Sequence, residues 1–166
     1  MKQSTVRKLF STKSLCVSAV IAALYAALTL LLAPISYGNL QCRVSEALTL
    51  LPAVLPQAVP GLFVGCLIAN LFSPAVNVFD IVFGSLATLL AAYGTYKLRA
   101  KPVLAYACPI VSNGIIVGLE LALTSGLPIA LTMAEVALGE IGAVLIGVVM
   151  LYALKKVNFD FRQFDK

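Results

Sequence analysis

The sequence lacks histidine and tryptophan altogether, and only 11% of its 166 residues are charged, whereas 61% are hydrophobic. The mean hydropathy is +1.00. A water-soluble domain of this size does not contain so many apolar residues, because polar residues must cover much of its surface. The composition therefore predicts an integral membrane protein. The absence of histidine also removes the most common general acid–base group, which disfavours an enzyme.

Cysteine is scarce and has no metal-binding pattern. The four cysteines show no C-x-x-C spacing and have no histidine beside them, so we expect small packing residues and no metal or redox site at Cys16, Cys42, Cys66 and Cys108. The chain also lacks a phosphate-binding loop and a nucleophile with a nearby base. We therefore predict no catalytic residue, no metal, no cofactor held by this chain and no nucleic-acid partner.

Near-continuous apolar runs occupy residues 15–35, 47–72, 81–96, 103–123 and 129–154, and several reach the roughly 20 residues that cross a bilayer. The basic N-terminus followed by the first run resembles a secretory signal. That run is too long for a signal peptide, and further spans follow it, so we assign it to the first helix. We predict one all-α membrane domain over residues 1–166, surrounded by lipid.

The basic residues set the number of crossings. Eleven of the twelve fall in three places: four in the N-terminal tail, three in "KLRAK" (97–101) and four after residue 154. Lys and Arg in short flanking segments mark the cytoplasmic side. If all three clusters are cytoplasmic, an even number of crossings must separate them.

The run over residues 47–72 must then cross twice or not at all. Pro52, Pro56 and Pro60 interrupt it, which predicts two short helices over about 46–57 and 60–72 and six crossings in total. The alternative is a re-entrant pair that dips in from outside. The six-helix bundle covers about 15–154, between cytoplasmic tails at 1–14 and 155–166.

This topology places five of the seven acidic residues in the outer half of the bundle. Polar side chains that converge there are Arg43, Glu46, Asn70, Asp80, Asn113, Glu120, Glu135 and Glu140. A carboxylate inside a span is expensive to bury and usually faces a partner or a wet cavity, which favours a functional role for Glu120 and Glu140. Carboxylates and an asparagine suit a cationic or donor-rich solute. We predict an externally open binding pocket.

Simpler interpretations stay open for several of these residues. Asp80 is also suited to complement a helix dipole, and Arg43 and Glu46 are also spaced for a local surface ion pair. Asn113 and Glu120 are seven residues apart and share a helix face. Glu135 and Glu140 do not, so one of them is expected to pair with a neighbouring helix.

Three segments in order, "GNLQCRVSEALTLLP", "GLFVGCLIANLFS" and "DIVFGSLATLLAA", resemble the QueT family of queuosine-precursor transporters, which are S components of energy-coupling factor (ECF) transporters. The resemblance implies six helices, capture of a deazaguanine base from outside, in the aminomethyl form, and docking onto a membrane T subunit with two ATPases that hydrolyse ATP. It also implies that Gln41, Arg43 and Glu46 line or latch the entrance.

Small residues recur in the first helix at Ala19, Ala23 and Ala27, a spacing that lets another helix approach closely. The resemblance implies that these alanines face the T subunit. Ordinary packing inside the bundle is the alternative. We assign the pairs Gly61/Gly65 and Gly114/Gly118 to internal packing.

Three other functions are alternatives to an S component for a deazaguanine base. An S component for another vitamin or for queuine differs only in its cargo. A proton-coupled carrier that uses Glu120 and Glu140 as relay groups needs no ATPase partner. An intramembrane enzyme is disfavoured, because the chain offers no histidine and no activated nucleophile.

Overall fold

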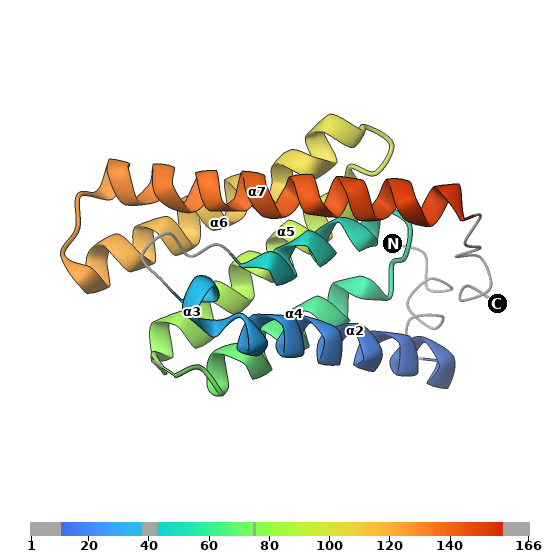
Figure 1. Cartoon of the computed structure of the whole chain (residues 1–166), viewed down its shortest axis with the longest axis horizontal. Helices are drawn as coiled ribbons and strands as arrows, with labels where there is room; N and C mark the ends of the chain where they lie inside the picture. Colours follow the sequence, from blue (N-terminus) through green and yellow to red (C-terminus); the bar gives the residue numbers. More distant parts are fainter. Residues whose placement is uncertain (1–10, 38–42, 75, 158–166) are drawn as a thin grey trace.

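The computed structural model describes residues 11–37, 43–74 and 76–157, and all regular structure in these ranges is helical (Figure 1). Three of the described helices are long and apolar enough to cross a membrane: α2 (Thr12–Leu31), α6 (Pro102–Ser125) and α7 (Ile129–Lys156). Two further apolar segments are shorter, at Val44–Ala53 and Ala58–Leu71. The all-α prediction is confirmed, whereas the number of six crossings stays a prediction.

Helix α2 begins where the sequence offers a capping side chain. The Ser11 hydroxyl accepts a hydrogen bond from the Ser14 backbone N–H at 3.2 Å, which satisfies a donor at the helix start. The continuous helix predicted over residues 15–35 is wrong, because α2 ends at Leu31 and a single turn, α3 (Ala33–Ser36), follows. Pro34 explains this break, since proline has no N–H and its ring clashes with the preceding turn.

The proline-rich stretch forms two segments, as predicted, but their geometry differs from the prediction. The first is a 3₁₀ helix, η1 (Val44–Ala53), rather than an α-helix over 46–57, and the second is α4 (Ala58–Leu71). A 3₁₀ run of ten residues is unusually long. Eight of its residues are buried. Tertiary packing, rather than favourable local hydrogen bonding, therefore stabilises this segment.

The second half of the chain follows the predicted runs closely. A five-residue π-helix, η2 (Asp80–Gly84), continues into α5 (Ser85–Lys97), where the sequence predicted a helix over 81–96. Helices α6 and α7 are joined by a short turn in which Gly126 has φ +67°, a conformation that favours glycine.

Successive long segments alternate in direction along the bundle (Figure 1). As a result, the start of α2, the α5–α6 turn and the end of α7 lie at the same end of the molecule. These three places carry the described basic residues of the clusters, which are Lys13, Lys97, Arg99, Lys101, Lys155 and Lys156.

Close contacts between helices depend on glycine. The predicted internal packing of the pairs Gly61/Gly65 and Gly114/Gly118 is confirmed. A Cβ atom on Gly61 would lie 2.6 Å from the Ser18 carbonyl oxygen, and one on Gly65 would lie 2.8 Å from that of Ala22. The backbones of α2 and α4 therefore approach more closely than any side chain allows. Gly118 packs in the same way against Met133, so α6 contacts α7 through glycine.

Many large apolar side chains point outward, around a core in which others such as Leu50 and Leu62 are buried. Leu24, Leu90 and Leu145 are 51%, 51% and 61% exposed, while polar side chains such as Glu46, Thr88 and Asn113 are buried. This distribution suits a protein that is surrounded by lipid and keeps its polar groups inside the bundle.

Candidate functional site

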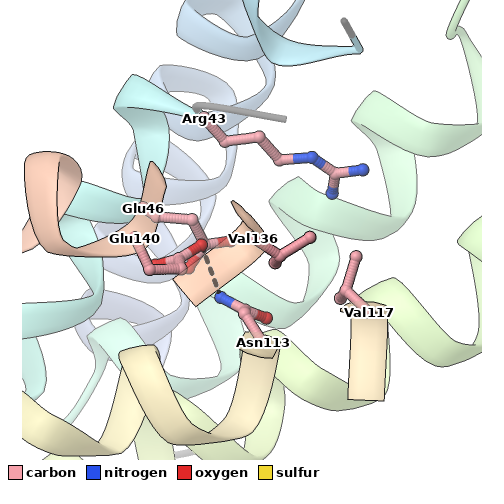
Figure 2. A pocket seen from close by; sticks show the side chains of 6 residues that line it. All are labelled: Arg43, Glu46, Asn113, Val117, Val136 and Glu140. Atoms are coloured by element: carbon pink, nitrogen blue, oxygen red, sulfur yellow. Dashed lines mark hydrogen bonds between the residues drawn. The ribbon is translucent and has the colours of Figure 1, made fainter. Parts of the chain in front are cut away.

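A small cavity inside the bundle gathers predicted site residues from three elements (Figure 2). Its lining comprises Arg43, Glu46, Asn113, Val117, Val136 and Glu140, which belong to the start of η1, to α6 and to α7. The cavity measures about 10 Å³, enough for about one water molecule. We call it the inner cavity. The structure thus brings four predicted polar residues together around one space.

Glu46 is held in place by two hydroxyl groups from different helices. Its side chain is 1% exposed, and its Oε1 accepts hydrogen bonds from the Tyr25 hydroxyl on α2 and, at 2.9 Å, from the Thr88 hydroxyl on α5. Its second oxygen, Oε2, has no hydrogen-bond partner among the described residues. Two donors on one oxygen fix the carboxylate and leave the other oxygen available.

Glu140, on α7, shows the same arrangement. Asn113 donates from Nδ2 to Glu140 Oε1 at 2.8 Å, and both side chains are at least 95% buried (Figure 2). Glu140 Oε2 has no partner within the described chain. Each of the two carboxylates therefore has one anchored oxygen and one unsatisfied oxygen, in a place where an unmade hydrogen bond is costly.

Arg43 is buried, which rules out the surface ion pair that its spacing from Glu46 also suggested. The side chain is 5% exposed, its Nη1 lies 3.9 Å from the Cys66 sulfur, and its guanidinium carbon lies 5.3 Å from the centre of the Tyr37 ring. Its Nε and Nη2 have no hydrogen-bond partner in the described ranges. The guanidinium group is thus held mainly by a cation–π contact, which is a weak restraint.

Asp80 and Glu120 lie near one another but do not line the inner cavity. Asp80 begins η2, Glu120 lies on α6, and their carboxyl groups are close enough to interact electrostatically. Glu120 shares the buried face of α6 with Asn113, as the seven-residue spacing predicted. Four of the five predicted acidic residues therefore form two carboxylate pairs, Glu46 with Glu140 and Asp80 with Glu120.

Two further predicted residues, Asn70 and Glu135, do not line the inner cavity. Asn70 is fully buried and donates from Nδ2 to the Asp80 backbone carbonyl at 2.8 Å, so it anchors η2 to α4. Glu135 is half-buried on α7 and does not line the inner cavity. Gln41 lies outside the described residues.

Four side chains that the sequence reasoning missed complete the site: Tyr25, Tyr37, Cys66 and Thr88. Cys66 is fully buried and lies 3.5 Å from the amide nitrogen of Asn70 and 3.4 Å from the Thr88 hydroxyl, so its surroundings are polar. Cys16, by contrast, is exposed and does not pack inside the bundle as predicted. The sequence does contain a pattern that points to Tyr25, because Ser18, Tyr25 and Thr29 form a polar stripe on one face of α2.

The alanines of α2 divide between two faces. Ala19, Ala23 and Ala27 are exposed, while Ala22 and Ala26 are buried. Ala19 also lines an open groove between α2 and α4, beside Gly61, Phe63 and Val64. Internal packing is therefore excluded for the three exposed alanines.

The chemistry of the site is that of recognition. It offers unsatisfied carboxylate oxygens, an amide and a guanidinium group around a small space lined by buried side chains. Within the described ranges, no group of three or more His, Cys, Asp or Glu side chains is placed to hold a metal ion. Such a site is suited to bind a small molecule that carries several N–H donors.

Comparison with known proteins points the same way. The chain matches the sequence profile of the QueT transporter family over residues 15–156. It is 29% identical over 153 residues to the queuosine precursor transporter QueT of Lactococcus lactis subsp. cremoris (strain MG1363), covering 83% of this chain and 89% of that protein. No solved structure matches the chain.

Proposed function

We propose that this chain, which belongs to the QueT transporter family, is the substrate-binding membrane subunit of an ECF-type importer for a queuosine precursor. The cargo is a 7-deazaguanine base in its aminomethyl form, taken up from outside. The chain itself binds and releases the base. A membrane T subunit and two ATPase subunits supply the energy.

The paired carboxylates of the inner cavity carry this proposal. Glu46 and Glu140 line the same small space and each has one unsatisfied oxygen, and Asn113 adds an amide group. A deazaguanine base presents several N–H donors along one edge. Carboxylates accept such donors in parallel, and a buried acceptor that gains a donor is strongly stabilised.

The base enters only after side chains move apart. A cavity of about 10 Å³ is far smaller than the roughly 300 Å³ or more that ligand pockets usually enclose. Arg43 is the group we expect to move, because two of its three nitrogens have no hydrogen-bond partner among the described residues. Its movement opens the cavity toward Tyr37, over which its guanidinium group lies.

Six crossings with both termini in the cytoplasm complete the proposed topology. The alternation of successive segments and the position of the basic residues at one end of the bundle support it (Figure 1). Segments η1 and α4 are then short crossings. Glu46 lies near the start of η1, so the inner cavity opens toward the end opposite to the basic residues.

The exposed alanines of α2 form the proposed contact surface for the T subunit. Ala19, Ala23 and Ala27 follow one another on the outer face of the helix, and small side chains permit close helix contacts. The open groove beside Ala19 gives a partner helix room to approach.

Binding to the purified chain tests the proposal. Wild-type protein in detergent is expected to bind aminomethyl-deazaguanine. Glu140→Gln replaces the unsatisfied oxygen with an N–H donor and should weaken binding by about one to two decades, since a hydrogen bond to a charged group contributes about 1.5–3 kcal/mol. Glu135→Gln, on the same helix but outside the cavity, is the matched control and should bind normally.

Two results would count against this function. No detectable binding of the base by the wild-type chain would refute the cargo assignment. Uptake of the base by vesicles that contain this chain alone, without ATPase partners, would instead favour a proton-coupled carrier that uses Glu120 and Glu140.

A further inference from the structure

The second carboxylate pair, Asp80 and Glu120, has no role in the inner cavity. The two carboxyl groups interact where η2 packs against α6. Beside them an open cavity of about 400 Å³ is lined by Tyr37, Val76, Asn77, Asp80, Leu121, Thr124 and Ser125. We call this space the outer cavity. It has hydroxyl, amide and carboxyl groups on its walls. Glu120 does not line it; Glu120 lines the adjoining, almost entirely apolar groove beside α5 and α6, and Thr124 borders both spaces.

Glu120 lacks the hydrogen bonds that a buried carboxylate needs. Glu120 is only 7% exposed, and neither of its carboxylate oxygens has a hydrogen-bond partner within the described chain. Asp80 Oδ1 is unsatisfied as well. The nearby Thr124 hydroxyl donates to the backbone carbonyl of Glu120 at 3.0 Å and so does not compensate. Two adjacent, unsatisfied carboxyl groups favour a cation between them.

Arg43 does not serve as that cation. Its guanidinium group acts on Glu120 electrostatically, but Nη1 points toward Cys66 and the plane lies over Tyr37. Its other two nitrogens reach no acceptor in the described ranges. Arg43 thus leaves the pair without a hydrogen-bonded basic side chain, and a cationic group of a ligand can take that place.

A primary ammonium group fits this place better than other cations. It is a compact charge with three donors, which two neighbouring carboxylates can accept together. A divalent metal would need about six oxygen ligands. Among the described residues, the pair supplies only two carboxyl groups.

The two cavities are also close enough to bind one molecule. Asn113 and Val117 line the inner cavity, and Glu120 follows on the same face of α6, about 10 Å along the axis from Asn113. Arg43 and Tyr37 lie between the two spaces, because Arg43 lines the inner cavity and stacks over Tyr37, which lines the outer one. A ligand whose ring binds in the inner cavity and whose amine binds beside the outer cavity would span the two spaces.

We propose that Asp80 and Glu120 form an ammonium subsite that selects the aminomethyl form of the base over neutral forms. This assignment rests on the proposed function, in which the ring edge binds between Glu46 and Glu140. The first carboxylate pair then recognises the heterocycle, and the second recognises the charge of its substituent.

The test compares two bases that have the same deazaguanine ring and differ in the charge of the substituent. Binding of aminomethyl-deazaguanine and of the corresponding neutral nitrile is measured by calorimetry with wild-type protein and with Asp80→Asn, Glu120→Gln and Glu140→Gln. Asp80→Asn and Glu120→Gln should each weaken binding of the amine by about 10- to 100-fold and leave binding of the nitrile unchanged. Glu140→Gln should weaken both ligands, because it contacts the shared ring. Using two separate subsite variants guards against one that fails to fold.

The outcomes separate this assignment from the proposed function. If wild-type protein binds neither base, the proposed function fails. If it binds the bases but Asp80→Asn and Glu120→Gln change the affinities for amine and nitrile equally, or not at all, the pair only shares a proton within the bundle and the ammonium subsite is refuted.

Discussion

At the residue scale, the site consists of buried polar groups whose hydrogen bonds are incomplete. Glu46 and Glu140 use one oxygen each within the protein, and Arg43 leaves two nitrogens unpaired within the described chain. Every such group lowers the stability of the empty protein. A ligand that supplies the missing donors and acceptors recovers this free energy, so the protein is expected to unfold at a higher temperature when the base is bound.

The hydroxyl group of Tyr25 gives a first prediction. Tyr25→Phe keeps the ring in its fully buried place but removes one of the two donors that hold Glu46, so the carboxylate loses its fixed orientation. Affinity for the base should fall about tenfold, as measured by calorimetry in detergent.

Thr29→Val is the matched control for that change. It also removes a buried hydroxyl from α2, one that lies 2.6 Å from the Ser45 hydroxyl and does not contact Glu46. It should lower the unfolding temperature without changing affinity. Equal affinities for wild-type protein and Tyr25→Phe would show that Tyr25 does not orient the site.

Sequence reasoning found the charged residues of the site but not their supports. A carboxylate in an apolar run, such as Glu140, is conspicuous because burying its charge is costly. The hydroxyls of Tyr25 and Thr88 are not, because serine, threonine and tyrosine are tolerated in apolar helices for many reasons. The division of the acids into two pairs depends on how η2 packs on α6, and no spacing within one helix contains that information.

At the element scale, glycine sets how closely α2 and α4 approach. A second prediction follows, that Gly65→Ala will destabilise the protein by about 1–3 kcal/mol, because the added methyl carbon would lie 2.8 Å from both the Ala22 carbonyl oxygen and the Tyr25 Cβ. The unfolding temperature in detergent should fall by several degrees.

Gly142→Ala is the control, since no atom lies within 4 Å of its added carbon. That variant should be as stable as the wild type or slightly more so, because alanine favours a helix over glycine. The same loss of stability in both variants would mean that helix propensity, and not the α2–α4 contact, decides the effect.

The boundaries of the elements show what the sequence determines. Helix α6 was predicted over 103–123 and is Pro102–Ser125, and α7 was predicted over 129–154 and is Ile129–Lys156. Prolines, a glycine turn and terminal lysines mark these ends clearly. The 3₁₀ and π geometries of η1 and η2 were not predicted, because they depend on contacts with neighbouring helices rather than on local residue preferences.

At the scale of the whole molecule, the proposed importer separates binding from energy supply. A third prediction is that Ala23→Trp will abolish ATP-dependent uptake by the reconstituted complex while leaving the affinity of the isolated chain unchanged. Ala23 is exposed on α2, whereas Ala22 and Tyr25 are buried, so a large side chain at Ala23 blocks a partner helix but not the site.

Leu145→Trp tests whether any bulky change at the surface has this effect. Leu145 is 61% exposed on α7, which carries no proposed partner surface. Its substitution should preserve uptake. Loss of binding together with uptake in Ala23→Trp would show that α2 was distorted, and the partner surface would have to lie elsewhere.

The orientation of the bundle gives a fourth prediction. Ser125 lies at the α6–α7 turn and Ala100 at the α5–α6 turn, at opposite ends of the same helix. An impermeant thiol reagent on intact cells should label Ser125→Cys but not Ala100→Cys, and permeabilised cells should allow both reactions. The reverse pattern on intact cells would invert the proposed topology. Cys42, predicted to face outward, lies outside the described residues.

The small size of the inner cavity has a kinetic consequence. If the base binds only after the cavity opens, the observed dissociation constant equals the intrinsic constant divided by the open fraction. The observed association rate should then stop rising at high ligand concentration and level off at the opening rate, which stopped-flow fluorescence can measure. Arg43→Ala removes the side chain between the two cavities and should raise that plateau. A rate that stays linear in ligand concentration for the wild type would show that opening never limits capture.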